Sequence, residues 1–162
     1  MPTSKLPRYA IIVAGGKGLR MGSALPKQFL PLAGRPVLMH TLERFARVVD
    51  EVILVLPEDH IIYWEGLCQE YDFTLPIRLA LGGETRFHSV LSALRQLPKS
   101  GLVAVHDGVR PLVSQELIET CFVQAETAGA ALPALPMTDS LRQLDETGSS
   151  HAVERSQFVG VQ

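Results

Sequence analysis

The sequence contains little cysteine and no long hydrophobic run. Its 162 residues include two cysteines, Cys68 and Cys121, which are too far apart for the usual spacing of metal ligands or of a redox pair. We interpret both as buried free thiols inside helices, which suits a reducing cytoplasm. The apolar stretch that follows the first few residues is too short for a signal sequence or a membrane span, so we expect no export.

The chain also lacks an excess of charge of one sign. Fifteen Lys and Arg residues oppose 17 Asp and Glu residues, which gives a formal net charge of −2. This balance is unlike that of proteins that bind nucleic acid by neutralising phosphates, so we expect neither a nucleic acid nor a membrane as partner. The length and the 46% of hydrophobic residues suit one domain with one core.

Apolar stretches alternate with segments of helical periodicity along most of the chain. The pattern predicts strands at residues 9–13, 51–56, 77–80, 102–106 and 130–135. It predicts helices at residues 36–47, 58–71, 85–96 and 115–128. Pro36 suits a first helical position, Ser114 an N-cap and Gly129 a helix stop. Strands that are apolar on both faces and joined by helices predict a Rossmann-like α/β fold, with a mainly parallel sheet and helices on both faces.

A polar segment late in the chain departs from this alternation. Residues 141–145 and 151–155 flank the polar turn 146–150, a pattern typical of a β-hairpin. The hairpin is too polar for a core position. We therefore expect one domain over residues 1–162, with a projecting β-hairpin arm at residues 138–156.

The first predicted strand runs into a loop that is rich in glycine and positive charge. The glycines of residues 15–18 expose backbone amides, and Arg20 and Lys27 add positive charge that backbone dipoles cannot supply. Together these features predict a nucleoside triphosphate site. The dinucleotide-binding fingerprint is excluded because Met21 stands where its third glycine belongs, and the Walker motif is excluded because Gly18 replaces its Ser or Thr.

Two further loops with unusual residues follow predicted strands, at residues 82–89 and 106–110. The carboxyl ends of parallel strands lie at one edge of a sheet, so we expect both loops to converge with the glycine-rich loop. Strand alternation places Asp107 on the same face as Val103 and Val105, and His106 on the opposite face. Asp107 is therefore the better functional candidate, and we interpret His106 as a packed, hydrogen-bonded histidine.

Four motifs occur in a characteristic order: Ala14-Gly15-Gly16-x-Gly18-x-Arg20-Met21, Pro26-Lys27-Gln28, Gly82-Gly83-Glu84-Thr85-Arg86 with Ser89-Val90, and His106-Asp107-x-x-Arg110-Pro111. In these motifs the sequence, from about residue 9 to its end, resembles the 2-C-methyl-D-erythritol 4-phosphate cytidylyltransferase family. The resemblance implies a nucleotide-diphospho-sugar transferase fold, a homodimer, and Mg²⁺-dependent cytidylyl transfer from CTP to a polyol phosphate. This acceptor is 2-C-methyl-D-erythritol 4-phosphate, and the products are CDP-methylerythritol and pyrophosphate in non-mevalonate isoprenoid biosynthesis.

The resemblance also implies roles for individual residues. Arg20 and Lys27 are the implied catalytic residues, which stabilise charge at the α-phosphate and on the leaving pyrophosphate. The implied nucleotide-binding residues are Ala14, Gly15, Gly16, Gly18, Gly83, Glu84, Ser89 and Asp107. The implied acceptor-binding residues are Asp107, Arg110, Ser140 and Arg155, of which the last two serve the neighbouring subunit. Asp107 is also the implied Mg²⁺ ligand. Two positions depart from the family pattern, because Glu84 replaces Asp and Ser140 replaces Thr.

Family members continue beyond the position that matches Gln162, so we expect this chain to be incomplete at its C-terminal end. Three alternatives stay open at this point. The acceptor could be ribitol 5-phosphate, the chain could be a sugar-nucleotide pyrophosphorylase, or it could be an inactive nucleotide-binding or dimerisation module.

Overall fold

The computed structural model describes residues 6–16 and 25–161 of the chain. They belong to two compact units, which are divided between Phe122 and Val123. Among the described residues, no helix has both the length and the apolar character needed to cross a membrane.

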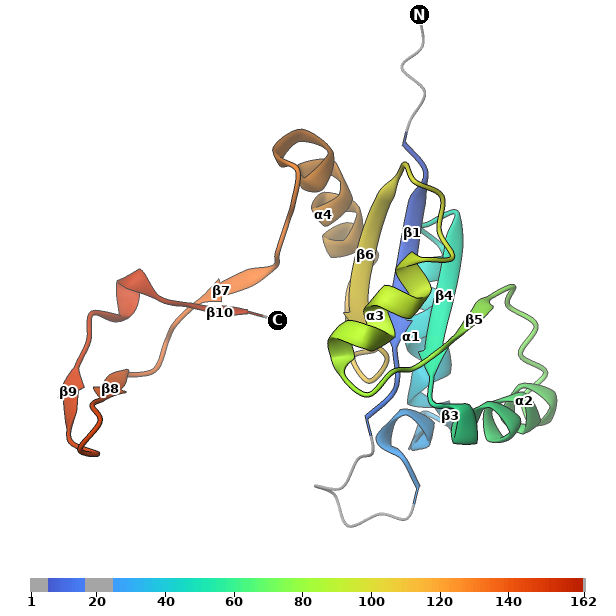
Figure 1. Ribbon diagram of the computed structural model, residues 1–162, viewed down its shortest axis with the longest axis horizontal. Helices are drawn as coiled ribbons and strands as arrows, with labels where there is room; N and C mark the ends of the chain where they lie inside the picture. Colours follow the sequence, from blue (N-terminus) through green and yellow to red (C-terminus); the bar gives the residue numbers. More distant parts are fainter. Residues whose placement is uncertain (1–5, 17–24, 162) are drawn as a thin grey trace, which may run out of the picture. The chain divides into compact units, whose positions relative to one another are not determined.

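A four-stranded sheet forms the centre of the first unit (Figure 1). Its strands are β1 (Arg8–Val13), β4 (Glu51–Leu56), β5 (Arg78–Leu81) and β6 (Leu102–Asp107), and they lie in the order β5-β4-β1-β6. All neighbouring pairs are parallel. The chain moves outward from β1 through β4 to β5 and then returns to place β6 on the other side of β1. Ligands bind at the carboxyl ends of the strands beside such a reversal, which are here β1 and β6.

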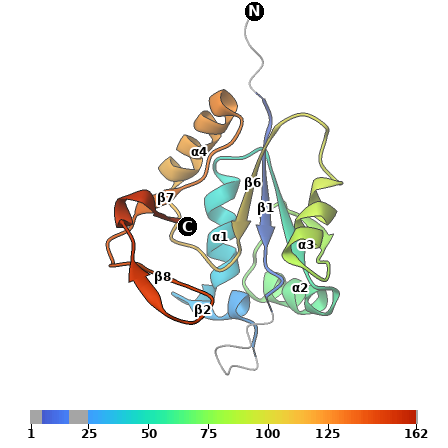
Figure 2. The same cartoon turned by 60° about the vertical axis from the view of Figure 1, so that its left-hand side comes forward.

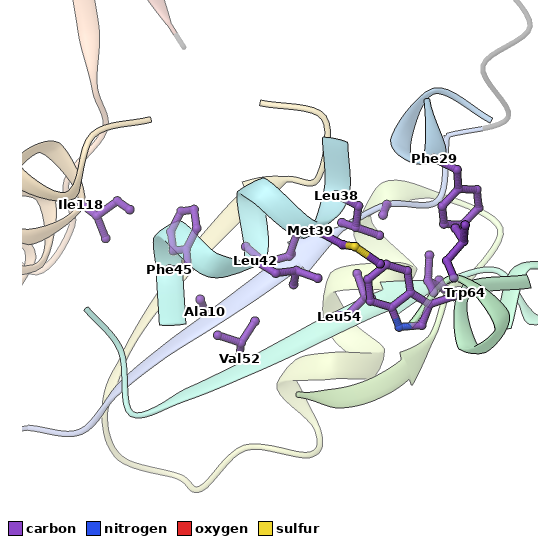
Figure 3. Close-up of a cluster of buried hydrophobic side chains, with 14 of the residues drawn as sticks. Ala10, Phe29, Leu38, Met39, Leu42, Phe45, Val52, Leu54, Trp64 and Ile118 are labelled. Atoms are coloured by element: carbon purple, nitrogen blue, oxygen red, sulfur yellow. The ribbon is translucent and has the colours of Figure 1, made fainter. Parts of the chain in front are cut away.

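Helices cover both faces of this sheet, as the two buried clusters of the first unit show. α1 (Val37–Ala46), α2 (Ile61–Glu70) and the first half of α4 (Gln115–Ala128) pack on one face through the larger cluster, which is drawn in Figure 3. α3 (Arg86–Leu94) packs on the other face, where Ala93 contacts alternate residues of the strands. Figure 2 shows α1 and α3 on opposite sides of the sheet. The predicted parallel sheet with helices on both faces is confirmed.

Local capping explains where several helices begin and end. Thr85 caps α3 by accepting a hydrogen bond from the backbone N–H of His88 (3.2 Å), and Ser114 caps α4 by accepting one from Leu117 N–H (3.1 Å). Gly129, with φ of +86°, ends α4 as predicted.

Two predicted helix starts are wrong. Pro36 has extended backbone and belongs to a strand, so α1 begins one residue later. Residues 58–60 form the 3-10 helix η3 (Glu58–His60), so α2 begins only at Ile61.

A short connection that periodicity did not predict joins the glycine-rich loop to α1. It contains the 3-10 helix η2 (Lys27–Phe29) and the two-stranded hairpin of β2 (Pro31–Leu32) with β3 (Arg35–Pro36). Ala33 and Gly34 at the hairpin turn both have positive φ, as a tight two-residue β-turn requires.

The second unit contains two small antiparallel sheets, in which β7 (Ala134–Pro136) pairs with β10 (Val159–Val161) and β8 (Arg142–Leu144) pairs with β9 (Ser150–Ala152). A 3-10 helix, η4 (Arg155–Gln157), precedes β10. The predicted hairpin over residues 141–155 is therefore confirmed, with shorter strands, and its strand residues are exposed as their polarity indicates.

The fifth predicted strand, residues 130–135, is wrong in extent and placement, because only residues 134–136 are extended and they pair with β10. Pro133 and Pro136 lack the N–H that an inner strand of a sheet needs. The assignment of residues 1–162 to a single domain with an arm at 138–156 stays a prediction.

Candidate functional site

The carboxyl ends of β1 and β6 lie side by side and bring two loops together. Val13 is the register partner of Asp107, and Gly108 N–H donates to the Val13 carbonyl (2.9 Å). A Cβ atom on Gly108 would lie 3.0 Å from the Cβ of Ala14 and 2.9 Å from Cδ1 of Leu38. The absence of a side chain at Gly108 thus lets the start of the glycine-rich loop approach the loop after β6.

Asp107 joins the third loop to this site through two arginines. Arg86 Nη2 donates to Asp107 Oδ1 (3.2 Å), and Arg110 Nε donates to Asp107 Oδ2 (3.0 Å). Arg86 belongs to the predicted segment at residues 82–89 and begins α3, so this segment and the loop after β6 meet at Asp107, beside the described start of the glycine-rich loop. Burial raises the pKa of the Asp107 carboxyl, but the hydrogen bonds and charges of the two arginines outweigh burial and hold this pKa below its ordinary value.

The glycine-rich loop is described in part. Ala14, Gly15 and Gly16 follow β1, and the Ala14 N–H donates to the Val55 carbonyl (3.0 Å). Lys27 lies in η2, is half-buried, and has no ion pair or side-chain hydrogen bond with other described residues. Gly18 and Arg20 lie outside the described residues. Among the described residues, Lys27 is therefore a cation without a protein partner, and it lies in η2, which contacts the glycine-rich loop through Gln28.

The loop after β5 is held close to α3. The N–H of Gly83 donates to Ser89 Oγ (3.0 Å), and Ser89 is buried. A Cβ atom on Gly83 would lie only 2.5 Å from the Cβ of His88. Ser89 therefore fixes the backbone of this loop, while Glu84 is exposed to solvent. Nucleotide binding by Gly83, Glu84 and Ser89 stays a prediction.

His106 lies on the face opposite to Asp107, as strand alternation predicts. Its ring packs against Phe45 of α1, with the ring centroids 4.7 Å apart. The predicted packing of His106 is confirmed. The predicted hydrogen bond is not found at Nδ1, which is buried and has no hydrogen-bond partner among the described residues. Burial lowers the pKa of His106, although the charge of Asp107 partly opposes this effect.

In the described part of the chain, a carboxylate paired with two arginines lies at the end of β6, and Lys27 adjoins Gln28, whose side chain contacts the start of the glycine-rich loop. These charged groups suit a polyanionic ligand. The family model of 2-C-methyl-D-erythritol 4-phosphate cytidylyltransferase matches residues 9–162. This chain belongs to that family. A cytidylyltransferase of this name from Porphyromonas gingivalis is 59% identical over 158 residues, which cover 98% of this chain and 71% of the relative. Another from Bacteroides fragilis is 50% identical over 157 residues, which cover 96% and 71%.

Solved structures of the cytidylyltransferase family agree with the fold. The crystal structure of 4-diphosphocytidyl-2C-methyl-D-erythritol synthase from Anaerococcus prevotii has a TM-score of 0.74 and 31% identity, and the match covers 97% of this chain and 67% of that chain. The α/β fold and the transferase class that the motifs indicated are confirmed.

The second unit contains the two residues that the family resemblance assigns to the acceptor of a neighbouring subunit. Arg155 Nη1 donates to the Thr138 carbonyl (2.7 Å), and Ser140 is exposed two residues further along that segment. Arg155 also lines a hollow of about 650 Å³, together with Met137 and Phe158. The acceptor role of Ser140 and Arg155 stays a prediction.

Two further residues contact the candidate site and have no role predicted from the sequence. Gln28 is 1% exposed, and its Nε2 donates to the Ala14 carbonyl (2.8 Å). Thr41 is fully buried, and its Oγ1 donates to the Gly108 carbonyl (2.9 Å). The available signal was a polar residue within an apolar pattern, since Gln28 precedes Phe29-Leu30 and Thr41 falls on the apolar face of its helix.

Proposed function

We propose that this chain transfers the cytidylyl group of CTP to 2-C-methyl-D-erythritol 4-phosphate, which gives CDP-methylerythritol and pyrophosphate. Its membership of the cytidylyltransferase family supports this activity. The structural observation that carries the proposal is that Arg86 and Arg110 meet at Asp107, beside the described start of the glycine-rich loop at the β1/β6 strand ends.

The reaction requires positioned positive charge more than it requires a base. An oxygen of the acceptor phosphate attacks the α-phosphorus of CTP, the bond from that phosphorus to the bridging oxygen breaks, and pyrophosphate leaves with the bond electrons. The acceptor phosphate is ionised at neutral pH, so no proton has to be removed. Lys27 and Arg20 neutralise charge at the α-phosphate and on the leaving group, while the amides of residues 15–18 bind phosphate oxygens.

We propose that the loop at residues 82–89 selects a pyrimidine base. The hydrogen bond from the Gly83 N–H to Ser89 Oγ holds the residues before α3 against this helix, and the lack of a side chain at Gly83 lets them lie close to His88. The loop therefore has little freedom to widen for a purine. Its backbone groups are the groups that read the edge of cytosine, which makes CTP the expected nucleotide.

Mg²⁺ is proposed as the cofactor, with Asp107 as its ligand. Mg²⁺ commonly binds one or two carboxylates, several waters and substrate phosphates, so a single carboxylate beside a triphosphate site fits it. The described residues contain no group of three or more His, Cys, Asp or Glu that could hold a metal without substrate. When bound, Mg²⁺ supplies charge neutralisation on the phosphates. Arg86 and Arg110 hold the Asp107 carboxylate in place at the strand end.

We further propose that the acceptor phosphate is bound by Arg110 together with Ser140 and Arg155 of a second copy of the chain. The Arg155 guanidinium can contact two phosphate oxygens at once, which a lysine cannot. The protein is therefore proposed to act as a homodimer with shared sites. Both cysteines are free thiols, although each is partly exposed rather than buried as expected. A cytoplasmic location is proposed because free thiols suit a reducing compartment.

Pyrophosphate release tests this function directly. The whole chain is incubated with CTP and Mg²⁺ and with either 2-C-methyl-D-erythritol 4-phosphate or ribitol 5-phosphate. Lys27→Ala should reduce the rate by roughly 10²–10³, the effect of losing one preorganised electrostatic donor. Lys99→Ala is the matched control, because Lys99 is exposed and lies before the amino end of β6, whereas the candidate site lies at the carboxyl ends of the strands. Equal losses in both variants, or no release with either acceptor, would refute the proposal.

A further inference from the structure

Two buried side chains donate hydrogen bonds to backbone carbonyls of the two loops at the β1/β6 strand ends. Gln28 donates to the carbonyl of Ala14 at the start of the glycine-rich loop, and Thr41 donates to the carbonyl of Gly108 in the loop after β6. Both side chains are at most 1% exposed. Neither lies in the loop that it holds, because Gln28 comes from η2 and Thr41 from α1.

The Gln28 contact connects the candidate nucleotide loop with the segment that carries Lys27. Phe29, the next residue, is 3% exposed and packs edge-on against Tyr63, with the ring centroids 5.0 Å apart. The Gln28 Nε2 also lies 3.4 Å from Nδ1 of His60. The packing of Phe29 against α2 therefore fixes the position of Gln28, and the hydrogen bond from Gln28 fixes the position of the Ala14 carbonyl.

Thr41 contacts the loop after β6, which carries Arg110, the proposed acceptor ligand. Thr41 is a neighbour along α1 of Leu38, whose side chain leaves no room for a Cβ atom at Gly108. Gly108 lies between Asp107, which the two arginines hold, and Arg110, the proposed acceptor ligand. Thr41 therefore fixes the carbonyl at the point where the chain leaves β6 and turns toward Arg110.

We propose that Gln28 and Thr41 are positioning residues for different substrates: Gln28 places the nucleotide loop and Thr41 places the acceptor loop. This inference rests on the proposed function for the identity of the two substrates. Each residue is linked to one loop by one buried hydrogen bond. Loss of either bond leaves a backbone carbonyl without its protein donor, so the affected loop shifts while the other loop keeps its own donor.

Gln28→Met and Thr41→Val remove the donors with little change in side-chain volume, and Thr41→Ser keeps the hydroxyl as a conservative control. Kinetic constants for both substrates, CTP binding by calorimetry and amide hydrogen exchange of the ligand-free chain are compared with those of the original chain. Gln28→Met should raise the KM and Kd of CTP by about 5- to 30-fold, the effect of losing one buried hydrogen bond. The KM of the acceptor should stay within about twofold of the original.

Thr41→Val should show the opposite pattern, with the larger increase in the KM of the acceptor, and Thr41→Ser should restore it. Amide exchange should become faster at Ala14 in Gln28→Met and at Gly108 and Arg110 in Thr41→Val, because the N–H groups of these residues are hydrogen-bonded in the original chain. Equal changes for both substrates, or faster exchange spread over the whole sheet, would overturn the inference and leave both residues as ordinary parts of the core.

The exchange and calorimetric measurements separate this inference from the proposed function. If the original chain binds CTP but forms no product, the proposed transfer fails, while selective effects on CTP binding and on exchange still support the two positioning roles. If the original chain binds no CTP and neither variant changes exchange selectively, both the nucleotide site and the positioning roles are refuted.

Discussion

Replacement of Gly83 by alanine should damage CTP binding without unfolding the protein. The added Cβ would lie 2.5 Å from the Cβ of His88 and 3.1 Å from its carbonyl carbon. Carbon atoms pack at about 3.5–4.0 Å, so the loop must move by roughly 1 Å. His88 cannot rotate away, because its carbonyl carbon belongs to the backbone of α3 and its Cβ is fixed to that backbone.

A displacement of about 1 Å in a substrate-positioning loop can cost roughly 10²-fold in rate, and we expect that loss in kcat/KM for CTP. Gly83 is exposed, so the loop can shift into solvent and the free energy of unfolding should change little. Steady-state kinetics at saturating acceptor and thermal unfolding followed by circular dichroism measure the two quantities.

Gly66→Ala is the matched control for this substitution. An added Cβ at Gly66 meets no atom within 4 Å, and the residue is exposed within α2. Removal of a glycine from a helix interior should stabilise the protein by about 0.5–1 kcal/mol and leave kcat/KM unchanged. A Gly83→Ala variant whose kcat/KM for CTP stays within about twofold of the original would show that this loop does not position the nucleotide.

Three further predictions concern stability, pH and the acceptor. Thr85→Ala removes the side-chain cap of α3 and should lower the free energy of unfolding in urea by about 1 kcal/mol, whereas Thr85→Ser should retain most of it. Burial lowers the pKa of His106 below the ordinary 6.5, so its neutral form stabilises the fold above pH 6.5 and this stability is lost as the pH falls below that value. His106→Gln should therefore show a smaller loss of stability between about pH 7.5 and 5.5 in urea denaturation. Arg155→Lys should raise the KM of the acceptor by roughly tenfold in pyrophosphate-release kinetics and leave the KM of CTP unchanged, because lysine cannot bind two phosphate oxygens at once.

Each of these three predictions has a clear contrary result. An equal loss of stability in the alanine and serine variants of Thr85 would show that the cap hydrogen bond does not stabilise α3. The same decline with pH in His106→Gln as in the original chain would assign that decline to other groups. A higher KM for CTP in Arg155→Lys would place this arginine at the nucleotide rather than at the acceptor.

The main strands and helices could be predicted well because their apolar periodicity agrees with the residues that bound them. The strand at residues 51–56 is bounded by Asp50 and Pro57, and the helix at residues 115–128 lies between a serine cap and a glycine stop. The strand at residues 134–136 could not be placed in the same way, because prolines interrupt its apolar pattern and no local pattern predicted its partner, β10. The pairing of such short strands depends on tertiary structure rather than on local pattern.

For the candidate site, the strand ends and the alternation of side chains along a strand predict where single residues lie, but not which residues from other elements contact them. The position of Asp107 follows from alternation along β6, but its pairing with Arg86 depends on how α3 crosses the sheet. Thr41 and Gly108 are 67 residues apart, and their hydrogen bond exists only because α1 packs on the face of the sheet beside the carboxyl end of β6. The catalytic assignments of Lys27 and Arg20 stay predictions, and Arg20 lies outside the described residues.

Identification of the product tests the central claim most directly. The whole chain is incubated with CTP, Mg²⁺ and an equimolar mixture of 2-C-methyl-D-erythritol 4-phosphate and ribitol 5-phosphate, and the products are followed by phosphorus NMR and mass spectrometry. The proposed function predicts CDP-methylerythritol and pyrophosphate in equal amounts, with little CDP-ribitol. CDP-ribitol as the main product would contradict the assigned acceptor, and the absence of any CDP-alcohol would contradict the assignment of cytidylyl transfer to this chain.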